Sequence, residues 1–269
     1  MSSDYPFFQI EKRPAAKTAV LYFNRPEKLN AMNWPFWRDL PAVVSELEED
    51  GEILAVVIAG LGKSFSVGLD VMELFINHQD ALNAATAPAR QKLLQLILTM
   101  QEGISMIARS GKIYIAAIHR HCIGAGLDIA SACDLRLATT DAVFSLRETK
   151  ISIIADMGSL NLLPGIIGQA NTKLLAYTGR DIDAAEALRM GLISAIYEDR
   201  EILLEKAIAL AAEITANSGA VVRGTKKILK YMENHSAQDG MDYVASWNAA
   251  FLDIKEIEAA ITAAALRKK

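Results

Sequence analysis

Cysteine is scarce in this sequence, with two among 269 residues. Cys122 and Cys133 both lie in apolar stretches, and neither belongs to a motif with metal-ligand spacing. This scarcity argues against a disulfide framework or a zinc site, and we expect two buried free thiols. His119 and His121 flank Arg120 without carboxylates at metal-binding spacing, so we expect solvated loop histidines there and no metal.

The sequence also lacks a long apolar run, a block of like charge and a targeting segment. No apolar run approaches ~18 residues, so we expect no membrane span. The 28 basic and 32 acidic residues are mixed along the chain and leave a net charge of −4, which disfavours nucleic acid as a partner. The first residues and the C-terminal Arg267-Lys268-Lys269 match no secretory, organelle or peroxisomal signal, and from them we expect a cytoplasmic protein.

Apolar residues are abundant, at 52% of the chain, and their pattern changes along it. The runs LAVVIA at 54–59 and IYIAAI at 113–118 are typical of strands that are covered on both faces. Strand and helix signals alternate up to about residue 195, and the chain from residue 200 onward has only helical periodicity. We therefore predict an α/β core at 1–199 and a helical region at 200–269 that self-associates.

Two glycine-containing loops each follow a predicted buried strand, namely SVGLD at 66–70 and CIGAG at 122–126. If the backbone amides of Leu69 and Ala125 converge on one oxygen, they form an oxyanion hole, and the dipole of a helix expected at 127–133 adds to it. A merely structural turn explains the glycines equally well. The loops are not a dinucleotide fingerprint, because the third glycine is absent.

Three carboxylates, Asp128, Glu148 and Asp156, stand among apolar neighbours. Each has an ordinary structural explanation, as a first-turn helix residue, a solvated strand-end charge and a helix N-cap, respectively. Asp156, however, ends the apolar run 151–155, where an unpaired carboxylate is costly unless its pKa rises, as proton-transfer groups require. We therefore predict an active site here. No G-x-S-x-G motif supports nucleophilic hydrolysis.

The stretches FNRPEKLNAMN, GKSFSVGLDVMEL and CIGAGLDIASACDLRLAT resemble the enoyl-CoA hydratase/isomerase (crotonase) superfamily, and so do LLPGIIG and AEALRMGLISAIYE. The resemblance implies an α/β fold, a crotonase-like spiral of ββα units with a C-terminal helical trimerisation region, assembled as a trimer or hexamer. It also implies that Leu69 and Ala125 donate N–H groups to the thioester oxygen of an acyl-CoA. The residues expected to line the bound CoA are Gly68, Leu69, Asp70, Val71 and Met72, together with Ala125. No metal or redox cofactor is implied.

Within that superfamily, the trio of acids is similar to that of the Δ3,5-Δ2,4-dienoyl-CoA isomerase branch. Moving two conjugated double bonds takes a proton from C2 and returns one at C6, and these carbons lie too far apart in an extended chain for one carboxylate. The resemblance implies that Glu148 acts at C2 and Asp156 at C6, with the reverse order left open, and that Asp128 orients or tunes Glu148. Hydratases of the superfamily lack an acid at the position of Asp156.

The sequence departs from that branch at the second loop. Arg120-His121 stands where the branch has a small, glycine-rich entry, and Ala125 replaces a glycine. Because a side chain at Ala125 limits any positive φ, we expect an altered rate or acyl-chain preference. Two alternatives stay open: a hydratase or 3-enoyl-CoA isomerase on the same scaffold, and a catalytically weak acyl-CoA-binding or RNA-associated protein. The acidic balance argues against RNA.

Overall fold

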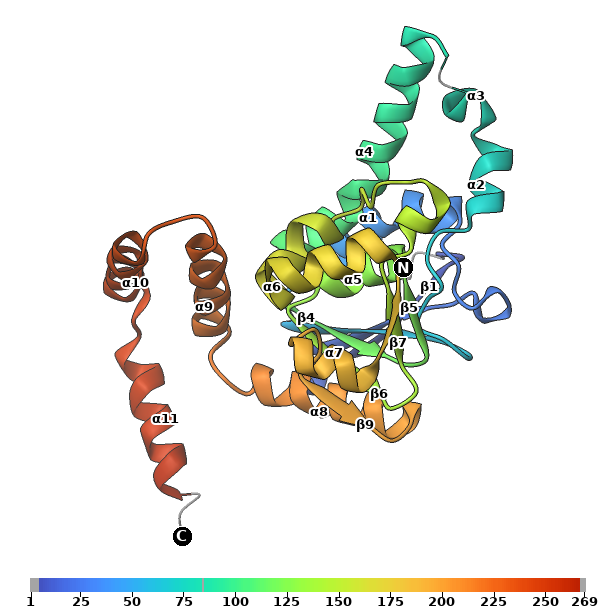
Figure 1. Cartoon of the computed structure of the whole chain (residues 1–269). Helices are drawn as coiled ribbons and strands as arrows, with labels where there is room; N and C mark the ends of the chain where they lie inside the picture. Colours follow the sequence, from blue (N-terminus) through green and yellow to red (C-terminus); the bar gives the residue numbers. More distant parts are fainter. Residues whose placement is uncertain (1–4, 84, 267–269) are drawn as a thin grey trace. The chain divides into compact units, whose positions relative to one another are not determined.

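The computed structural model describes residues 5–83 and 85–266, so the tripeptide Arg267-Lys268-Lys269 lies outside the described residues. The chain forms two compact units that divide between Glu213 and Ile214 (Figure 1). This division falls later than the boundary at residue 200 that we expected. The helix that begins there, α8 (Arg200–Thr215), buries Leu203, Ala207 and Ala211, and most of it belongs to the first unit.

A six-stranded sheet forms the centre of the first unit, with the order β1-β2-β3-β4-β6-β9. The first pair is antiparallel and every later pair is parallel. The continuous apolar strands lie in the middle, as expected for strands with both faces covered. The strand bounds are Phe8–Arg13, Thr18–Phe23, Ala55–Gly60, Ile113–Ile118, Leu135–Thr139 and Ala195–Tyr197, in sheet order.

A second sheet of three short strands has the order β5-β7-β8, with bounds His121–Ile123, Val143–Ser145 and Asp181–Asp183. The remaining α-helices of the first unit are α1 (Trp34–Glu49), α2 (Val71–Asn77), α3 (Gln79–Leu82), α4 (Ala87–Arg109), α5 (Ala125–Ala132), α6 (Ser159–Thr178) and α7 (Ala184–Met190). Three short 3₁₀ helices cover Pro14–Ala16, Pro26–Lys28 and Glu148–Ile151, the last being η3.

Helix packing in the first unit brings α5 to its centre. Helix α1 packs on α4, α4 on α5, and α5 on α6. At the first contact a Cβ on Gly103 would lie 2.5 Å from Cγ of Leu40, so only glycine lets α4 approach α1 so closely. Every residue of α5 is buried. Any polar side chain on α5 is therefore removed from bulk water, which decides the chemistry of Asp128.

The second unit consists of helices α9 (Gly219–Met232), α10 (Ala237–Phe251) and α11 (Ile254–Leu266). A capping box between Ser236 and Asp239 starts α10, and Gly224 of α9 lies directly against the ring of Trp247. Several large apolar side chains of this unit are exposed, namely Met241, Phe251, Leu252, Ile254, Ile257 and Ile261. Across the described residues of both units, none of the helices combines the length and apolar character that crossing a membrane requires.

Most of the predicted secondary structure of the core is confirmed. The strand at 113–118 has the expected bounds, and the apolar run at 54–59 forms β3 with a shift of one residue. The helix that we expected from residue 127 begins at Ala125. This two-residue difference matters, because it makes Ala125 the first residue of a buried helix.

Candidate active site

The two glycine-containing loops lie side by side beyond the carboxyl ends of the neighbouring parallel strands β3 and β4. Ser66 and Cys122 form an isolated parallel bridge between the loops, and Ser66 O accepts a hydrogen bond from the Ile123 N–H at 3.2 Å. Two residues further on, a Cβ built on Gly68 would lie 3.3 Å from the nitrogen of Ala125. The structure therefore brings the two predicted donor loops together.

The backbone amides of Leu69 and Ala125 both have a fixed orientation. Gly68 O, in the peptide group that carries the Leu69 N–H, accepts a hydrogen bond from Met32 N at 2.7 Å. Gly124 O, in the peptide group of the Ala125 N–H, accepts from the third and fourth residues of α5 at 2.7 and 3.1 Å. Because C=O and N–H point in opposite directions in a trans peptide, both N–H groups point away from these partners. Within the described residues, neither N–H donates to a protein group.

Positive φ angles in the loops fall on Gly68 (88°) and Gly124 (52°), and Ala125 is not among the described residues with positive φ. The Ala125 side chain therefore does not have to adopt a positive φ, because Gly124 adopts that conformation, and an altered rate or acyl-chain preference stays a prediction. Ala125 is instead the first residue of α5, so its N–H lies at the positive end of that helix. At Gly68 a Cβ would lie 2.6 Å from Ile123 O, which excludes larger residues.

Asp128 lies on α5 with a side chain that is 1% exposed. Its Oδ1 accepts hydrogen bonds from the backbone N–H of Ser159, at 2.7 Å, and from the Ser159 hydroxyl. Burial raises the pKa of Asp128 to about 7, with smaller increases from Glu148 and Asp156, against the lowering effect of the Ser159 hydrogen bonds. The carboxyl group that we expected to orient or tune Glu148 thus bonds to the first residue of α6, and the charge of Glu148 contributes to its raised pKa.

Glu148 is the first residue of η3, and its carboxyl group lies against the second loop. Its Oε1 is 3.1 Å from the position that a Cβ on Gly124 would take. Its Oε2 is buried without a hydrogen-bond partner among the described residues. Burial raises the pKa of Glu148, and the charge of Asp156 raises it further. Glu148 thus has a carboxyl group with a raised pKa beside Gly124 and one buried oxygen that no described protein group binds.

Asp156 is half-buried just before α6, and burial raises its pKa as well. The side chain of Gln101, on α4, donates a hydrogen bond to the backbone oxygen of Asp156 at 2.5 Å. The apolar run that we expected to bury Asp156 does not do so, because Ile153 and Ile154 are 37% and 77% exposed and Leu160 is also exposed. The sequence did not predict the role of Gln101. A helical glutamine that binds a neighbouring backbone oxygen cannot be told from a solvated one by residue type alone.

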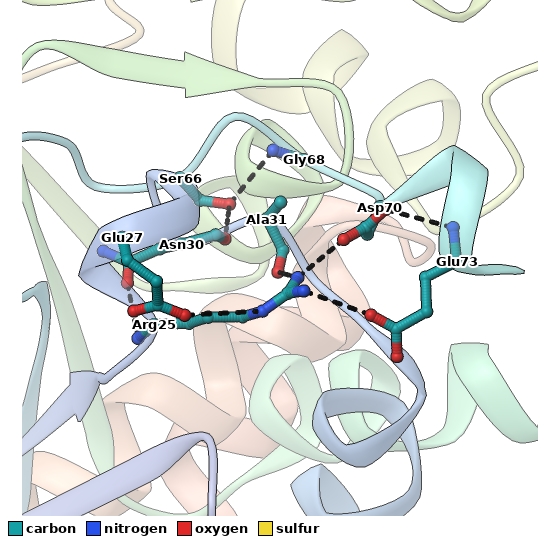
Figure 2. Close-up of polar contacts among 8 residues, drawn as sticks. All are labelled: Arg25, Glu27, Asn30, Ala31, Ser66, Gly68, Asp70 and Glu73. Carbon is teal, nitrogen blue, oxygen red and sulfur yellow. Dashed lines mark hydrogen bonds and ion pairs between the residues drawn. The ribbon is translucent and has the colours of Figure 1, made fainter.

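A polar network on the other side of the first loop was also missed (Figure 2). Asp70 is the N-cap of α2 and accepts from the Glu73 N–H at 3.1 Å, while Arg25 binds its carboxylate at 2.7 Å. Burial opposes the charge of Asp70, but these hydrogen bonds hold its pKa below the ordinary value. Of the other residues expected to line CoA, Val71 begins α2 and Met72 is exposed. Asp70 is thus engaged within the protein.

The histidines and cysteines have structural surroundings. His119 is buried, its Nε2 lies 3.1 Å from Gly62 O, and burial lowers its pKa to about 4. His121 Nδ1 lies 2.9 Å from the Ser64 hydroxyl. The expectation of solvated loop histidines is therefore wrong for His119. Both cysteines are free and buried, as predicted. Among the described residues, His, Cys, Asp and Glu side chains form no group of three that could hold a metal ion.

Comparisons with known proteins place similar sequences and a similar fold beside this chain. The profile of the Enoyl-CoA hydratase/isomerase family matches residues 14–265. The human mitochondrial Δ3,5-Δ2,4-dienoyl-CoA isomerase is 38% identical over 268 residues, which are 99% of this chain and 82% of that protein. The Arabidopsis thaliana peroxisomal Δ3,5-Δ2,4-dienoyl-CoA isomerase is 34% identical over 97% of this chain and 94% of its own length. A Thermobifida fusca YX protein of the enoyl-CoA hydratase type, solved in complex with CoA, has a TM-score of 0.80 and 27% identity, covering 91% of this chain and 92% of the other.

These similarities settle two of the expectations drawn from the sequence. The predicted crotonase-like α/β fold is confirmed by the structural match over most of both chains. The expectation of a cytoplasmic protein is wrong, because the similar isomerases are mitochondrial and peroxisomal enzymes. The composition of the first residues is therefore no guide to the compartment.

Proposed function

The chain belongs to the enoyl-CoA hydratase/isomerase family, and we propose that it is a Δ3,5-Δ2,4-dienoyl-CoA isomerase. The observation that carries this proposal is the third acid, Asp156, whose charge acts on Glu148 and whose own pKa is raised by burial. Hydration needs acids that hold a water molecule, whereas moving two double bonds needs a proton acceptor and a proton donor at separate carbons. The identity to named dienoyl-CoA isomerases over nearly the full chain supports the same choice.

In the proposed reaction, Glu148 takes a proton from C2 of a 3,5-dienoyl-CoA. The electrons of the broken C–H bond form a conjugated enolate, with double bonds at C1, C3 and C5, whose negative charge lies largely on the thioester oxygen. The amides of Leu69 and Ala125 stabilise that oxygen, and the loss of one such donor typically costs ~3 kcal/mol of transition-state stabilisation. Asp156 then delivers a proton to C6, which leaves the double bonds at C2 and C4.

This cycle needs one carboxylate and one carboxylic acid at the start. A raised pKa keeps an acid protonated near neutral pH, and burial supplies that shift for both Glu148 and Asp156. Because the charge of Asp156 raises the pKa of Glu148, the pair favours a single negative charge. We assign the charge to Glu148 and the proton to Asp156, and exchange experiments described below distinguish this from the reverse.

We further infer that the reaction needs no metal or redox cofactor, since proton transfer and amide stabilisation account for every step. We also propose that the protein assembles as a trimer or hexamer through its C-terminal unit. The exposed apolar side chains of α10 and α11 support this, because apolar surface of that extent is ordinarily covered in an assembly. The Ala125 side chain does not favour the alternative of a weak acyl-CoA-binding protein, since Gly124 and not Ala125 has the positive φ.

The test compares three reactions on the same purified protein. The rates of 3,5-dienoyl-CoA isomerisation, 3-enoyl-CoA isomerisation and 2-enoyl-CoA hydration are each followed by the ultraviolet absorbance of the conjugated thioester. We expect the first rate to exceed the other two. Faster hydration would show a hydratase, and acyl-CoA binding with no turnover of any substrate would show a binding protein.

A further inference from the structure

Residues 25–32 pack against the loop that carries the Leu69 amide, and nothing in the proposed reaction uses their polar groups (Figure 2). Arg25 is the charged residue of this segment that reaches furthest into the structure, with a side chain that is 16% exposed. Its Nη1 donates to Asp70 at 2.7 Å and to the backbone oxygen of Ala31 at 2.9 Å, and its Nη2 donates to Glu73 at 3.1 Å. An arginine so engaged has one fixed conformation.

The hydrogen bond to Ala31 O begins a series that ends at the candidate oxyanion hole. Ala31 O and Met32 N belong to the same peptide group. Met32 N donates to Gly68 O at 2.7 Å, and Gly68 O belongs to the peptide group of the Leu69 N–H. Two peptide groups in series therefore connect the Arg25 guanidinium to the amide that faces the thioester oxygen.

A second set of hydrogen bonds holds the same loop through Asn30, the residue before Ala31. The Arg25 N–H donates to Asn30 Oδ1 at 2.9 Å, and Asn30 O accepts from the Ser66 hydroxyl at 2.8 Å. Ser66 Oγ in turn accepts from the Gly68 N–H at 3.0 Å. Asn30 has a positive φ of 55°, an uncommon conformation for a residue other than glycine. The segment is thus shaped to meet the loop, and both ends of Gly68 are held.

Serial hydrogen bonds through peptide groups strengthen one another, by roughly 10–30% per bond. A guanidinium that donates to Ala31 O withdraws electron density from that peptide, makes Met32 N–H a better donor and, through Gly68 O, makes Leu69 N–H a better donor. The charge of Arg25 is offset by Asp70 and Glu73, so its long-range field is small. Its effect on the site acts through the bonded series and through the fixed direction of the amide.

We propose that Arg25 is a positioning residue that orients and polarises the Leu69 oxyanion donor through the peptide groups 31–32 and 68–69. This inference rests on the proposed function only in naming that amide as an oxyanion donor. It requires that the stretching frequency of a bound acyl-CoA thioester carbonyl depends on Arg25. It also requires that the loss of Arg25 affects the rate more than the affinity.

The experiment uses octanoyl-CoA with ¹³C at the thioester carbonyl, a saturated probe that cannot isomerise. Infrared difference spectroscopy gives the carbonyl stretching frequency in the full-length protein and in Arg25→Met. We expect the bound frequency to lie below that of free octanoyl-CoA and to move back toward it in Arg25→Met. We also expect kcat for 3,5-dienoyl-CoA to fall by about 10²-fold, as for a donor misplaced by a distant change, with the dissociation constant of octanoyl-CoA little changed.

The matched control is Arg38→Met, since Arg38 lies on α1, is 54% exposed and pairs with the adjacent Asp39. This variant should keep the wild-type frequency and rate. Folding is checked by circular dichroism and thermal unfolding. If Arg25→Met does not fold, Arg25→Lys replaces it, because lysine keeps the charge but cannot bind Ala31 O, Asp70 and Glu73 together.

Two results would overturn the proposal. One is a folded Arg25 variant with the wild-type carbonyl frequency. The other is a loss of rate that is fully explained by weaker binding or by a smaller folded fraction. The proposed function is judged separately by turnover of 3,5-dienoyl-CoA in the wild type. If the wild type lacks that turnover but the carbonyl frequency depends on Arg25, the isomerase assignment fails and the positioning role stands.

Discussion

The two sides of the candidate site consist of different chemical groups, backbone amides on one side and carboxyl side chains on the other. On the amide side, the working groups are backbone N–H donors, and the surrounding carbonyl, hydroxyl and guanidinium groups are fully engaged in holding them. On the acid side, the working groups are carboxyl side chains with few partners, and Glu148 Oε2 has none among the described residues. The first side is a fixed dipole array, and the second is a set of groups whose protonation can change.

This contrast matches what the proposed reaction requires of each side. Stabilising a developing oxyanion requires donors that do not reorganise during the reaction, which a hydrogen-bonded backbone provides. Moving protons near neutral pH requires carboxyl groups that are only weakly stabilised as anions, which burial with few donors provides. Changes on the acid side should therefore abolish proton transfer and spare binding, and changes on the amide side should reduce the rate by moving a donor.

The largest effect is expected for Asp156→Asn. Losing the proton donor for C6 should lower isomerisation by 10²- to 10⁴-fold, the usual range for general acid–base groups, while acyl-CoA binding remains. In D₂O, Glu148 should still exchange the C2 protons of a 3,5-dienoyl-CoA, which nuclear magnetic resonance detects. The companion variant Glu148→Gln should lose both exchange and isomerisation.

The two variants together also decide the order of the acids. If Glu148→Gln keeps C2 exchange and Asp156→Asn loses it, the roles are reversed. Near-normal turnover in Asp156→Asn would refute any catalytic role for this residue.

A smaller effect is expected on the amide side for Gly68→Ala. Gly68 has a φ of 88°, and a Cβ there would lie 2.6 Å from Ile123 O, so the peptide group of Leu69 has to shift. A donor misplaced by even 1 Å can lower the rate by about 10²-fold. Gly168→Ala is the matched control, because Gly168 also has a positive φ, 75°, but a Cβ there meets no atom within 4 Å.

Both glycine variants place a side chain at a positive φ, so both should lose thermal stability, and Gly68→Ala should lose more because of its contact with Ile123 O. Only Gly68→Ala should lose kcat in the dienoyl-CoA assay. Equal rates in the two variants would mean that the Leu69 amide does not take part.

The sequence was sufficient for much of the fold and for the amide side. The strand at 113–118 is an uninterrupted apolar run whose length suits a buried strand and no helix, and the structure has it there. Gly68 and Gly124 predicted the two turns correctly. A positive φ and a close backbone approach both favour glycine, so these features can be recognised from the residue type. These features are local, so a single sequence contains them.

The missed features depend on contacts between distant residues. Arg25 and Asp70 are far apart in the chain, and a hydrogen bond to the backbone oxygen of Ala31 requires no particular residue type at position 31. The apolar run before Asp156 was misjudged for a related reason. Hydrophobicity indicates that a segment tends to be buried, but it does not say which part of the structure buries it. Ile154 is apolar and yet 77% exposed.

The smallest expected effect concerns stability on the acid side. Burial raises the pKa of Asp128 from 3.8 to about 7 in the folded protein. Below pH 4 both the folded and unfolded states hold this proton. Between about pH 4 and 7 the unfolded state releases it first, so rising pH lowers the free energy of unfolding, by a few kcal/mol at most.

Asp128→Asn keeps an oxygen that can accept from Ser159 but does not titrate. We therefore expect the wild type to lose thermal stability relative to Asp128→Asn as the pH rises from about 4 to 7, measured by differential scanning calorimetry, with the exposed Asp80→Asn as control. A constant difference across this range would show that Asp128 has an ordinary pKa.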